Sequence, residues 1–243
     1  MQLPLHLIDP PQPKLDDGVT GRNAAALEAL QQAVTGPADR FSSLYLWGVP
    51  GSGKSFWLSA WADALGGRAH LINCNPSPAS PTMRAADALA TAIDAMESPA
   101  GPRIWLIDNV DQADGPTADR LFRLYNAARE WGHCLIATAG APPLRLACRD
   151  DLRTRLGQSL IFELQELDDH EKRTALRERA EKLALPLSED LLNYLLTRLP
   201  RDLGLLTRVL DSLNDYALSQ KRPATIPLLK ELLDSLHATT RPV

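Results

Sequence analysis

One glycine-rich segment carries the residues best suited to chemistry, and it reads Gly48-Val49-Pro50-Gly51-Ser52-Gly53-Lys54-Ser55. Its glycines let the backbone curl, so that successive N–H groups and the N-terminus of a following helix point at one anionic centre. Lys54 can then reach the terminal phosphates of a nucleotide, and the Ser55 hydroxyl can bind Mg²⁺. Because every fixed position of a phosphate-binding loop (P-loop) is filled, the segment predicts a site for a nucleoside di- or triphosphate.

Apolar runs at regular intervals predict the elements that must hold this loop. The loop follows a strand at 44–47 and precedes a helix that begins near residue 56. Further strands are predicted at 70–74, 103–108, 134–138 and 160–164, and helices at about 23–34, 83–96 and 117–131. Strands that alternate with helices in this way indicate an α/β domain, with a parallel sheet flanked by helices.

The pattern becomes purely helical after residue 167. Apolar residues recur there at helical spacing in 191–199, 203–213 and 228–236. Such stripes are typical of the core of a small helical domain rather than of a groove for a partner. We therefore expect an extended, proline-rich arm at 1–14, an α/β nucleotide-binding domain at 15–166 and a helical domain at 167–243.

Composition excludes several classes of protein. The 243 residues are 44% hydrophobic and 23% charged, with a formal net charge of -4, as in an ordinary globular protein. Neither half has the basic excess of a DNA-binding domain. The three cysteines lack the spacing of a metal or redox site, and no apolar run is long enough to span a membrane. We expect a cytoplasmic protein that has no membrane partner.

A carboxylate at a strand end is the second candidate for the site. Asp108 ends a strongly apolar strand, where a parallel sheet presents ligand-binding groups, so it is predicted to hold Mg²⁺ together with Ser55. The next residue, Asn109, cannot accept a proton, and we therefore expect weak intrinsic hydrolysis of a bound nucleotide. Asp111 could substitute as the acceptor, but its place beyond the strand end favours a turn residue.

Together, the P-loop, the strand end at 108–111, the strand that ends at Thr138 and the helical C-terminal part resemble an AAA+ ATPase module. Segments that are similar to the DnaA-related group, and most to its Hda family, which drives regulatory inactivation of DnaA, lie at 45–48, 141–144, 151–156 and 222–227. The resemblance covers nearly the whole chain. It implies an AAA+ P-loop domain followed by a small all-helical lid domain, with ADP or ATP and Mg²⁺ as ligands.

The resemblance also assigns roles to single residues of the first domain. Gly21 and Asn23 match the segment that lies against the adenine, although they equally suit an ordinary turn and a helix N-cap. Thr138 is similar to the sensor of the γ-phosphate. Gly140 stands where relatives carry an acidic residue, which further weakens the expectation of efficient hydrolysis.

Two arginines receive roles in the same way. Arg155 falls on the position of the arginine finger, which acts in trans on the nucleotide of a neighbouring subunit. Arg201 matches the lid sensor that touches the phosphates of the chain's own nucleotide. Without the resemblance, both would be interpreted as solvated surface arginines.

The first residues, Gln2-Leu3-Pro4-Leu5-His6-Leu7, resemble the short motif by which replication proteins dock on the sliding clamp of DNA polymerase. The resemblance gives the contact to Gln2, Leu3, Leu5 and Leu7. An extended segment can bury apolar side chains only against another protein, which suits this use. The alternative is a frayed N-terminus without a partner.

We expect a regulator of replication initiation that binds the clamp and activates ATP hydrolysis by DnaA. One alternative is a self-acting AAA+ ATPase or loader, which Asn109 and Gly140 argue against. Another is a DnaA paralogue that recruits replication proteins at DNA. The neutral charge balance opposes it, as does the expected lack of a helix-turn-helix domain, since the chain ends after its lid. The sequence leaves open which nucleotide is the working ligand and whether a homo-oligomer forms.

Overall fold

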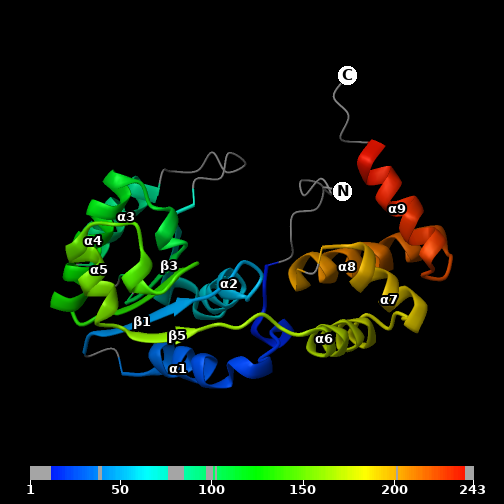
Figure 1. Ribbon diagram of the computed structural model, residues 1–243, viewed down its shortest axis with the longest axis horizontal. Coiled ribbons are helices and arrows are strands. Elements are labelled where there is room, and N and C mark those ends of the chain that lie inside the picture. Colours follow the sequence, from blue (N-terminus) through cyan, green and yellow to red (C-terminus); the bar gives the residue numbers. More distant parts are fainter. Residues whose placement is uncertain are drawn as a thin grey trace. The chain divides into compact units, whose positions relative to one another are not determined.

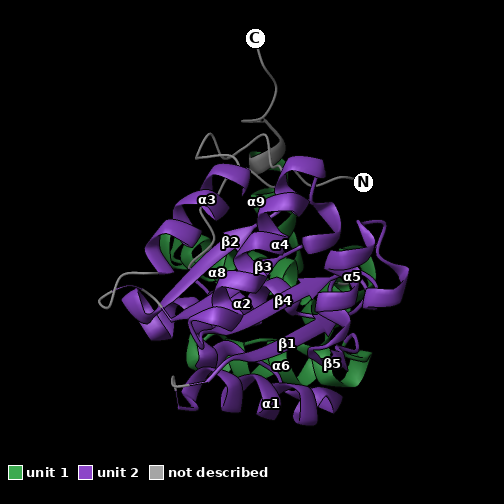
Figure 2. Cartoon of the chain, turned by 90° about the vertical axis from the view of Figure 1, so that its left-hand side faces the viewer, with its two compact units in different colours: residues 1–11, 167–243 green, residues 12–166 purple. Residues whose placement is uncertain are grey.

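The computed structural model describes residues 12–37, 40–75, 85–96, 101, 103–200 and 202–238, with side chains up to residue 235. These residues belong to two compact units, Gln12–Glu166 and the described part of Leu167–Val243 (Figure 2).

The first unit is built on a sheet of parallel strands. The strands are β1 (Ser42–Trp47), β2 (Ala69–Asn73), β3 (Ile104–Asp108), β4 (Cys134–Ala139) and β5 (Leu160–Glu163), and their order in the sheet is β2-β3-β4-β1-β5. Every pairing between neighbours is parallel. The prediction of a parallel sheet with flanking helices is confirmed, and the observed strand ends differ from the predicted ones by at most two residues.

Helices cover both faces of this sheet. They are α1 (Ala24–Thr35), α2 (Lys54–Leu65), α3 (Ala85–Met96), α4 (Gly115–Glu130) and α5 (Asp150–Gly157). Buried side chains of α1 and α2 pack with Leu44 and Leu46 of β1, whereas those of α3, α4 and α5 pack with Tyr45 of the same strand. Alternate residues of β1 thus face opposite layers, and Figure 1 shows α1 on the other side of the sheet from α3, α4 and α5.

The inner strands are apolar because helices cover them on both sides. All residues of β3 and of β4 are buried. The strand β5 differs, because within the described chain it pairs with β1 alone and forms one edge of the sheet, opposite the edge strand β2. Its Leu160 and Ile161 are 58% and 40% exposed.

Short 3-10 turns connect several of these elements. They are η1 (Leu15–Asp17), η2 (Gly21–Asn23), η3 (Gly66–Arg68), η4 (Val110–Gln112) and η5 (Pro143–Arg145). Two of them, η4 and η5, come shortly after the carboxyl ends of β3 and β4. They therefore lie at the edge of the sheet where a parallel fold presents its ligand-binding groups.

The second unit is helical, as predicted. It contains α6 (Asp169–Lys182), α7 (Glu189–Arg198), α8 (Leu203–Gln220) and α9 (Ile226–Ala238). A capping box between Asp168 and Glu171 starts α6, and the Arg179 guanidinium binds both carboxylate oxygens of Asp211 on α8 at 2.8 and 2.9 Å. The fully buried leucines of its core are Leu176, Leu191, Leu192, Leu195, Leu206, Leu210, Leu213, Leu228 and Leu229. Across both units, no described helix has the length and the apolar character needed to cross a membrane.

Candidate nucleotide-binding site

The glycine-rich loop joins β1 to α2, the context that its sequence predicts. Gly51 and Gly53 have φ angles of 85° and 92°, in the left-handed region that favours glycine. A Cβ atom on Gly48 would collide with the carbonyl oxygen of Leu164 and would lie 2.8 Å from Ser52 Oγ. The backbone conformation therefore favours glycine at 51 and 53, and the close approach of Leu164 requires it at 48.

Lys54 fills the centre of this loop. Its side chain is 8% exposed, and its Nζ donates hydrogen bonds to the carbonyl oxygens of Gly48 (2.7 Å) and Val49 (2.9 Å) and to Ser52 Oγ (3.3 Å). Burial lowers the pKa of the Lys54 ammonium, and the carboxylates of Asp108 and Asp111 act in the opposite direction. All three acceptors are uncharged, so a phosphate group can replace them with a stronger, charge-assisted hydrogen bond.

Asp108 and Thr138 meet at the ends of the adjacent strands β3 and β4. Asp108 is 4% exposed and Thr138 is fully buried. The Thr138 hydroxyl donates to Asp108 Oδ1, and the backbone N–H of Asn109 donates to Thr138 Oγ1 at 3.2 Å. The hydroxyl to which the family resemblance gives a phosphate-sensing role thus also orients the carboxylate that was predicted to hold Mg²⁺.

Asn109 links the ends of β2 and β3 through its side chain. Its Nδ2 donates to Asp108 Oδ2 and to Oδ1 of Asn73, both at 3.0 Å. Asn73 is the last residue of β2 and lies opposite Asp108 in the sheet register. The backbone of Asn109 is left-handed, with φ 57° and ψ 48°, a conformation that asparagine tolerates better than most residues. Asn73 was not among the predicted site residues, because its only signal in the sequence was a polar residue near the end of a predicted strand.

The residues present fit a nucleotide with its Mg²⁺. The loop offers backbone N–H groups and an ammonium to phosphate, while Ser55 and Asp108 offer the oxygen ligands that Mg²⁺ prefers. Nowhere in the described chain do three or more His, Cys, Asp or Glu side chains gather to hold a metal by themselves. This donor set matches Mg²⁺ sites in which phosphates and water supply the other ligands.

The residues assigned to the adenine side lie in η2 and take a different role from the expected cap. Gly21 has a φ angle of 49°. Asn23 occupies the N-cap position of α1, but its side chain makes no capping hydrogen bond. Its amide instead binds Gln165 through both the backbone N–H and the backbone carbonyl. The N-cap interpretation of this side chain is therefore wrong.

Arg155 is the unpaired arginine of α5. Arg149 forms ion pairs with Asp119 and Asp151, and Arg153 pairs with Asp150 at 2.9 Å. The Arg155 side chain is half-buried and, among the residues that the structure describes, has no hydrogen-bond or ion-pair partner. Its guanidinium is thus available to an external anion.

The chain path places Arg155 away from its own P-loop. Its carbonyl accepts a hydrogen bond from the N–H of Gln158 (3.1 Å), and two residues later Leu160 begins β5 opposite Leu44. The P-loop starts only after Trp47. Trp47 is three residues beyond Leu44, a distance of about 10 Å along the strand. Arg155 therefore lies near the edge where the strands begin, while the loop lies where they end.

Other sequence-predicted residues fall outside the described part of the chain. They are Arg201 of the helical unit and the clamp-motif residues Gln2, Leu3, Leu5 and Leu7.

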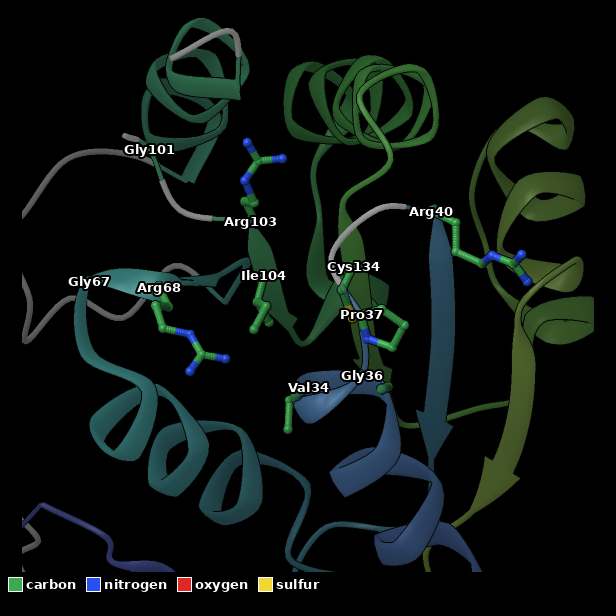
Figure 3. Close-up of a pocket in the computed structure, with 11 residues that line it drawn as sticks. Val34, Gly36, Pro37, Arg40, Gly67, Arg68, Gly101, Arg103, Ile104 and Cys134 are labelled. Carbon is green, nitrogen blue, oxygen red and sulfur yellow. The ribbon is translucent and has the colours of Figure 1, made fainter. Parts of the chain in front are cut away.

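A cavity of about 250 Å³ lies at the strand-start edge, beside the first residues of β3 and β4. Arg40, Arg68 and Arg103 line it, but their guanidinium groups point in different directions rather than toward one centre (Figure 3). No residue of the P-loop lines this cavity. It is therefore separate from the candidate nucleotide site.

Comparisons with known proteins agree with this architecture. Residues 169–233 match the family model of the Hda lid domain. Domain III of the replication initiation protein DnaA from Thermotoga maritima is similar over 93% of this chain and 98% of its own length, with a TM-score of 0.70 and 20% identity.

Two further solved structures share the fold. AMPPCP-bound DnaA from Aquifex aeolicus matches 83% of this chain at a TM-score of 0.63 and 18% identity, and this chain spans 64% of it. The RuvB Holliday junction branch migration motor from Thermotoga maritima matches 93% of this chain and 72% of its own at a TM-score of 0.62 and 15% identity. These likenesses concern the fold, and the family match concerns the helical unit.

Proposed function

We propose that this chain is a DnaA- and Hda-related AAA+ protein that regulates replication initiation. Its helical unit matches the Hda lid domain and its fold is similar to that of DnaA domain III. In this proposal it binds a nucleotide, docks on the sliding clamp and stimulates ATP hydrolysis by the initiator DnaA. In this role the protein acts mainly on the nucleotide of its partner. Its own nucleotide, ADP or ATP, is structural and turns over slowly.

The P-loop supports the first part of the proposal. Lys54 and the loop N–H groups would hold the phosphates, and Ser55 and Asp108 would hold Mg²⁺, which neutralises phosphate charge when it is bound. The similar Aquifex DnaA carries the nucleotide analogue AMPPCP. The side chain that follows Asp108 is an amide that already donates to two neighbours, so it supplies no base for an attacking water.

The observation that carries the second part is the guanidinium of Arg155, which has no partner among the described residues. The strand that follows Arg155 begins opposite Leu44, several residues before the P-loop in the sheet register, which supports an action outside the chain's own site. A planar guanidinium that enters a neighbouring site can stabilise the charge on a transferring phosphoryl group with two hydrogen bonds at once. We infer that Arg155 acts in trans on the nucleotide of DnaA.

The test measures phosphate release from ATP-bound DnaA in the presence of clamp-loaded DNA. Arg155→Ala should lower the stimulated rate by at least about tenfold while the variant still binds ADP and clamp. Arg155→Lys should rescue poorly, because it keeps the charge but not the planar fork. Arg68→Ala is the matched control. Arg68 is also an arginine without a partner among the described residues, but it is exposed and precedes β2, the strand at the opposite edge of the sheet from β5.

Two outcomes would contradict this mechanism. Full stimulation by Arg155→Ala would make Arg155 a surface residue without a role in hydrolysis. Loss of ADP binding by the same variant would place its action in the chain's own site.

Clamp docking is tested separately. Replacing Gln2 and Leu3 together by alanine should abolish binding to clamp on a surface plasmon resonance chip and leave ADP affinity unchanged, since contacts of an extended motif are local. Gln12→Ala, an exposed glutamine beyond the motif, is the control. Retained clamp affinity in the double variant would show that the motif arises by coincidence.

A further inference from the structure

The carboxylate of Asp111 lies against the backbone of Gly140. Asp111 is in η4, just after β3, and Gly140 directly follows β4, its neighbour in the sheet. A Cβ atom built on Gly140 would lie 3.0 Å from Asp111 Oδ2, and no other atom beyond the immediate chain neighbours would lie within 4 Å of it. Asp111 therefore fills the space that a side chain at position 140 would otherwise occupy.

The turn does not need this carboxylate. Its hydrogen bonds run from the N–H of Gln112 to Asn109 O (2.9 Å) and from the N–H of Ala113 to Val110 O (3.4 Å). The Asp111 carboxylate accepts only from the Gln112 side chain, at 3.3 Å, and forms no ion pair within the described residues. Asp111 is in a turn, as its sequence position predicts, but turn formation does not explain its side chain.

The charge of Asp111 acts on the P-loop. After Asp108, it is the second carboxylate whose field favours the charged form of Lys54. Its residue is exposed, so solvent and ligands can reach it, whereas Asp108 is buried. The strand ends thus present two carboxylates of different accessibility to the same ammonium.

We propose that Asp111, which lies in η4 beside Gly140, is a second acidic residue of the nucleotide site. Its carboxylate accepts hydrogen bonds from the water that surrounds the Mg²⁺ of the bound nucleotide. This role rests on the proposed nucleotide binding. It follows that Asp111 favours the Mg²⁺-nucleotide complex and disfavours the metal-free nucleotide, because without the cation its charge faces the phosphates directly.

The test compares ADP affinity in Mg²⁺ and in EDTA by isothermal titration calorimetry. Asp111→Ala should weaken binding about tenfold in Mg²⁺ but leave it equal or tighter in EDTA. Asp63→Ala removes another exposed carboxylate, on α2, and should change neither affinity. Equal ADP affinity of Asp111→Ala and wild type in Mg²⁺ would overturn the proposal, as would equal losses in Mg²⁺ and EDTA.

A relocation variant distinguishes a missing carboxylate from a disturbed turn. Gly140 is not in the left-handed region, so aspartate is allowed there, and in an Asp111→Ala background its Cβ has room. Asp111→Ala combined with Gly140→Asp should regain most of the Mg²⁺-dependent affinity. Gly140→Asp alone should lose affinity and melt at lower temperature, because it crowds two like charges.

The outcomes separate this inference from the proposed function. If wild type binds ADP neither in Mg²⁺ nor in EDTA, both the proposed nucleotide binding and the role of Asp111 are refuted. If wild type binds and the relocated carboxylate does not rescue, the role of Asp111 alone is refuted. Melting curves without nucleotide, expected to be similar for Asp111→Ala and wild type, check that the variant folds.

Discussion

The side-chain amide of Asn23 forms two hydrogen bonds with the backbone of Gln165. Its Nδ2 donates to the Gln165 carbonyl at 2.9 Å, and its Oδ1 accepts from the Gln165 N–H at 2.8 Å. The Asn23 side chain is buried, and the two residues are 142 positions apart in the chain. One amide thus ties the start of the α/β unit to the segment that leaves it after β5.

Asn23→Ala should lower the free energy of unfolding by about 1–3 kcal/mol, because it leaves two backbone groups of Gln165 without their partners. Urea unfolding followed by circular dichroism measures the change. Gln32→Ala, which removes an exposed hydrogen bond to Glu28, should stay within about 0.5 kcal/mol of wild type. A similar, small effect of both substitutions would show that water replaces the Asn23 amide without cost.

Lys54→Ala should abolish nucleotide binding, because the ammonium at the centre of the loop neutralises phosphate charge. With ADP at about 100 times its Kd, the melting temperature of wild type should rise by about 5–10 °C, and that of the variant should not rise. Lys14→Ala, an exposed lysine of the same unit, is the control and should keep the full shift. Unchanged ADP affinity of Lys54→Ala in calorimetry would refute the assignment of the loop.

Wild type should hydrolyse ATP far more slowly than about 1 s⁻¹, and Asn109→Glu should not raise the rate to that level. The substitution places a carboxylate beside Asp108 and removes the donor to Asn73, and glutamate is less tolerant of the left-handed backbone. The variant should instead lose stability, by about 1–3 kcal/mol.

Asn109→Gly separates the loss of the side-chain hydrogen bonds from the strain of the left-handed backbone. Glycine removes the side-chain hydrogen bonds but tolerates this backbone conformation. Phosphate release and urea unfolding are the measurements. A turnover near about 1 s⁻¹ in wild type would favour the self-acting ATPase instead of the regulator.

Acid should destabilise the α/β unit through His133. This residue is 3% exposed, and its Nδ1 accepts a hydrogen bond from Trp105 Nε1 at 3.0 Å. Burial first, and then the charge of Arg103, lower the pKa of His133 below its ordinary value of 6.5. The unfolded chain therefore binds the proton more readily, so stability should fall as the pH drops below about 6.5 and level off below the folded pKa.

His133→Asn keeps an acceptor oxygen but does not titrate, so it should flatten the loss of stability below about pH 6.5. His70→Asn changes an exposed histidine on β2 and should leave the acid-induced loss in place. Urea unfolding at a series of pH values measures both variants. An unchanged slope in His133→Asn would assign the acid sensitivity to other groups.

The fold was readable from the sequence because its determinants are local. The strands β3 and β4 are buried throughout and apolar apart from Asp108 and Thr138, since helices cover both faces. The P-loop needs glycines where the φ angle is positive. The apolar stripes of the helical unit follow from the 3.6-residue period, since one face of each helix is buried.

The contacts within the site could not be predicted from the sequence as well as the fold could, because they depend on strand register and side-chain rotamers. Asn73 meets Asn109 only because β2 pairs with β3 in a register that ends both strands together. Asn23 suited a helix cap by type and position, yet a residue far along the chain supplies its partners. Asparagine serves caps, turns and long-range bonds alike, so its type alone cannot select among them.

The edge strand β5 has a practical consequence for work with the purified protein. Apart from its pairing with β1, its backbone groups have no strand partner in the described chain, and two of its apolar side chains are exposed. Such an edge is a template on which a second chain can add a strand, and natural proteins commonly protect it with charge. The exposed Leu160 and Ile161 make β5 more prone to such pairing than a polar edge would be. Ile161→Lys, which places a charge on this edge, is therefore the first substitution to make for solubility.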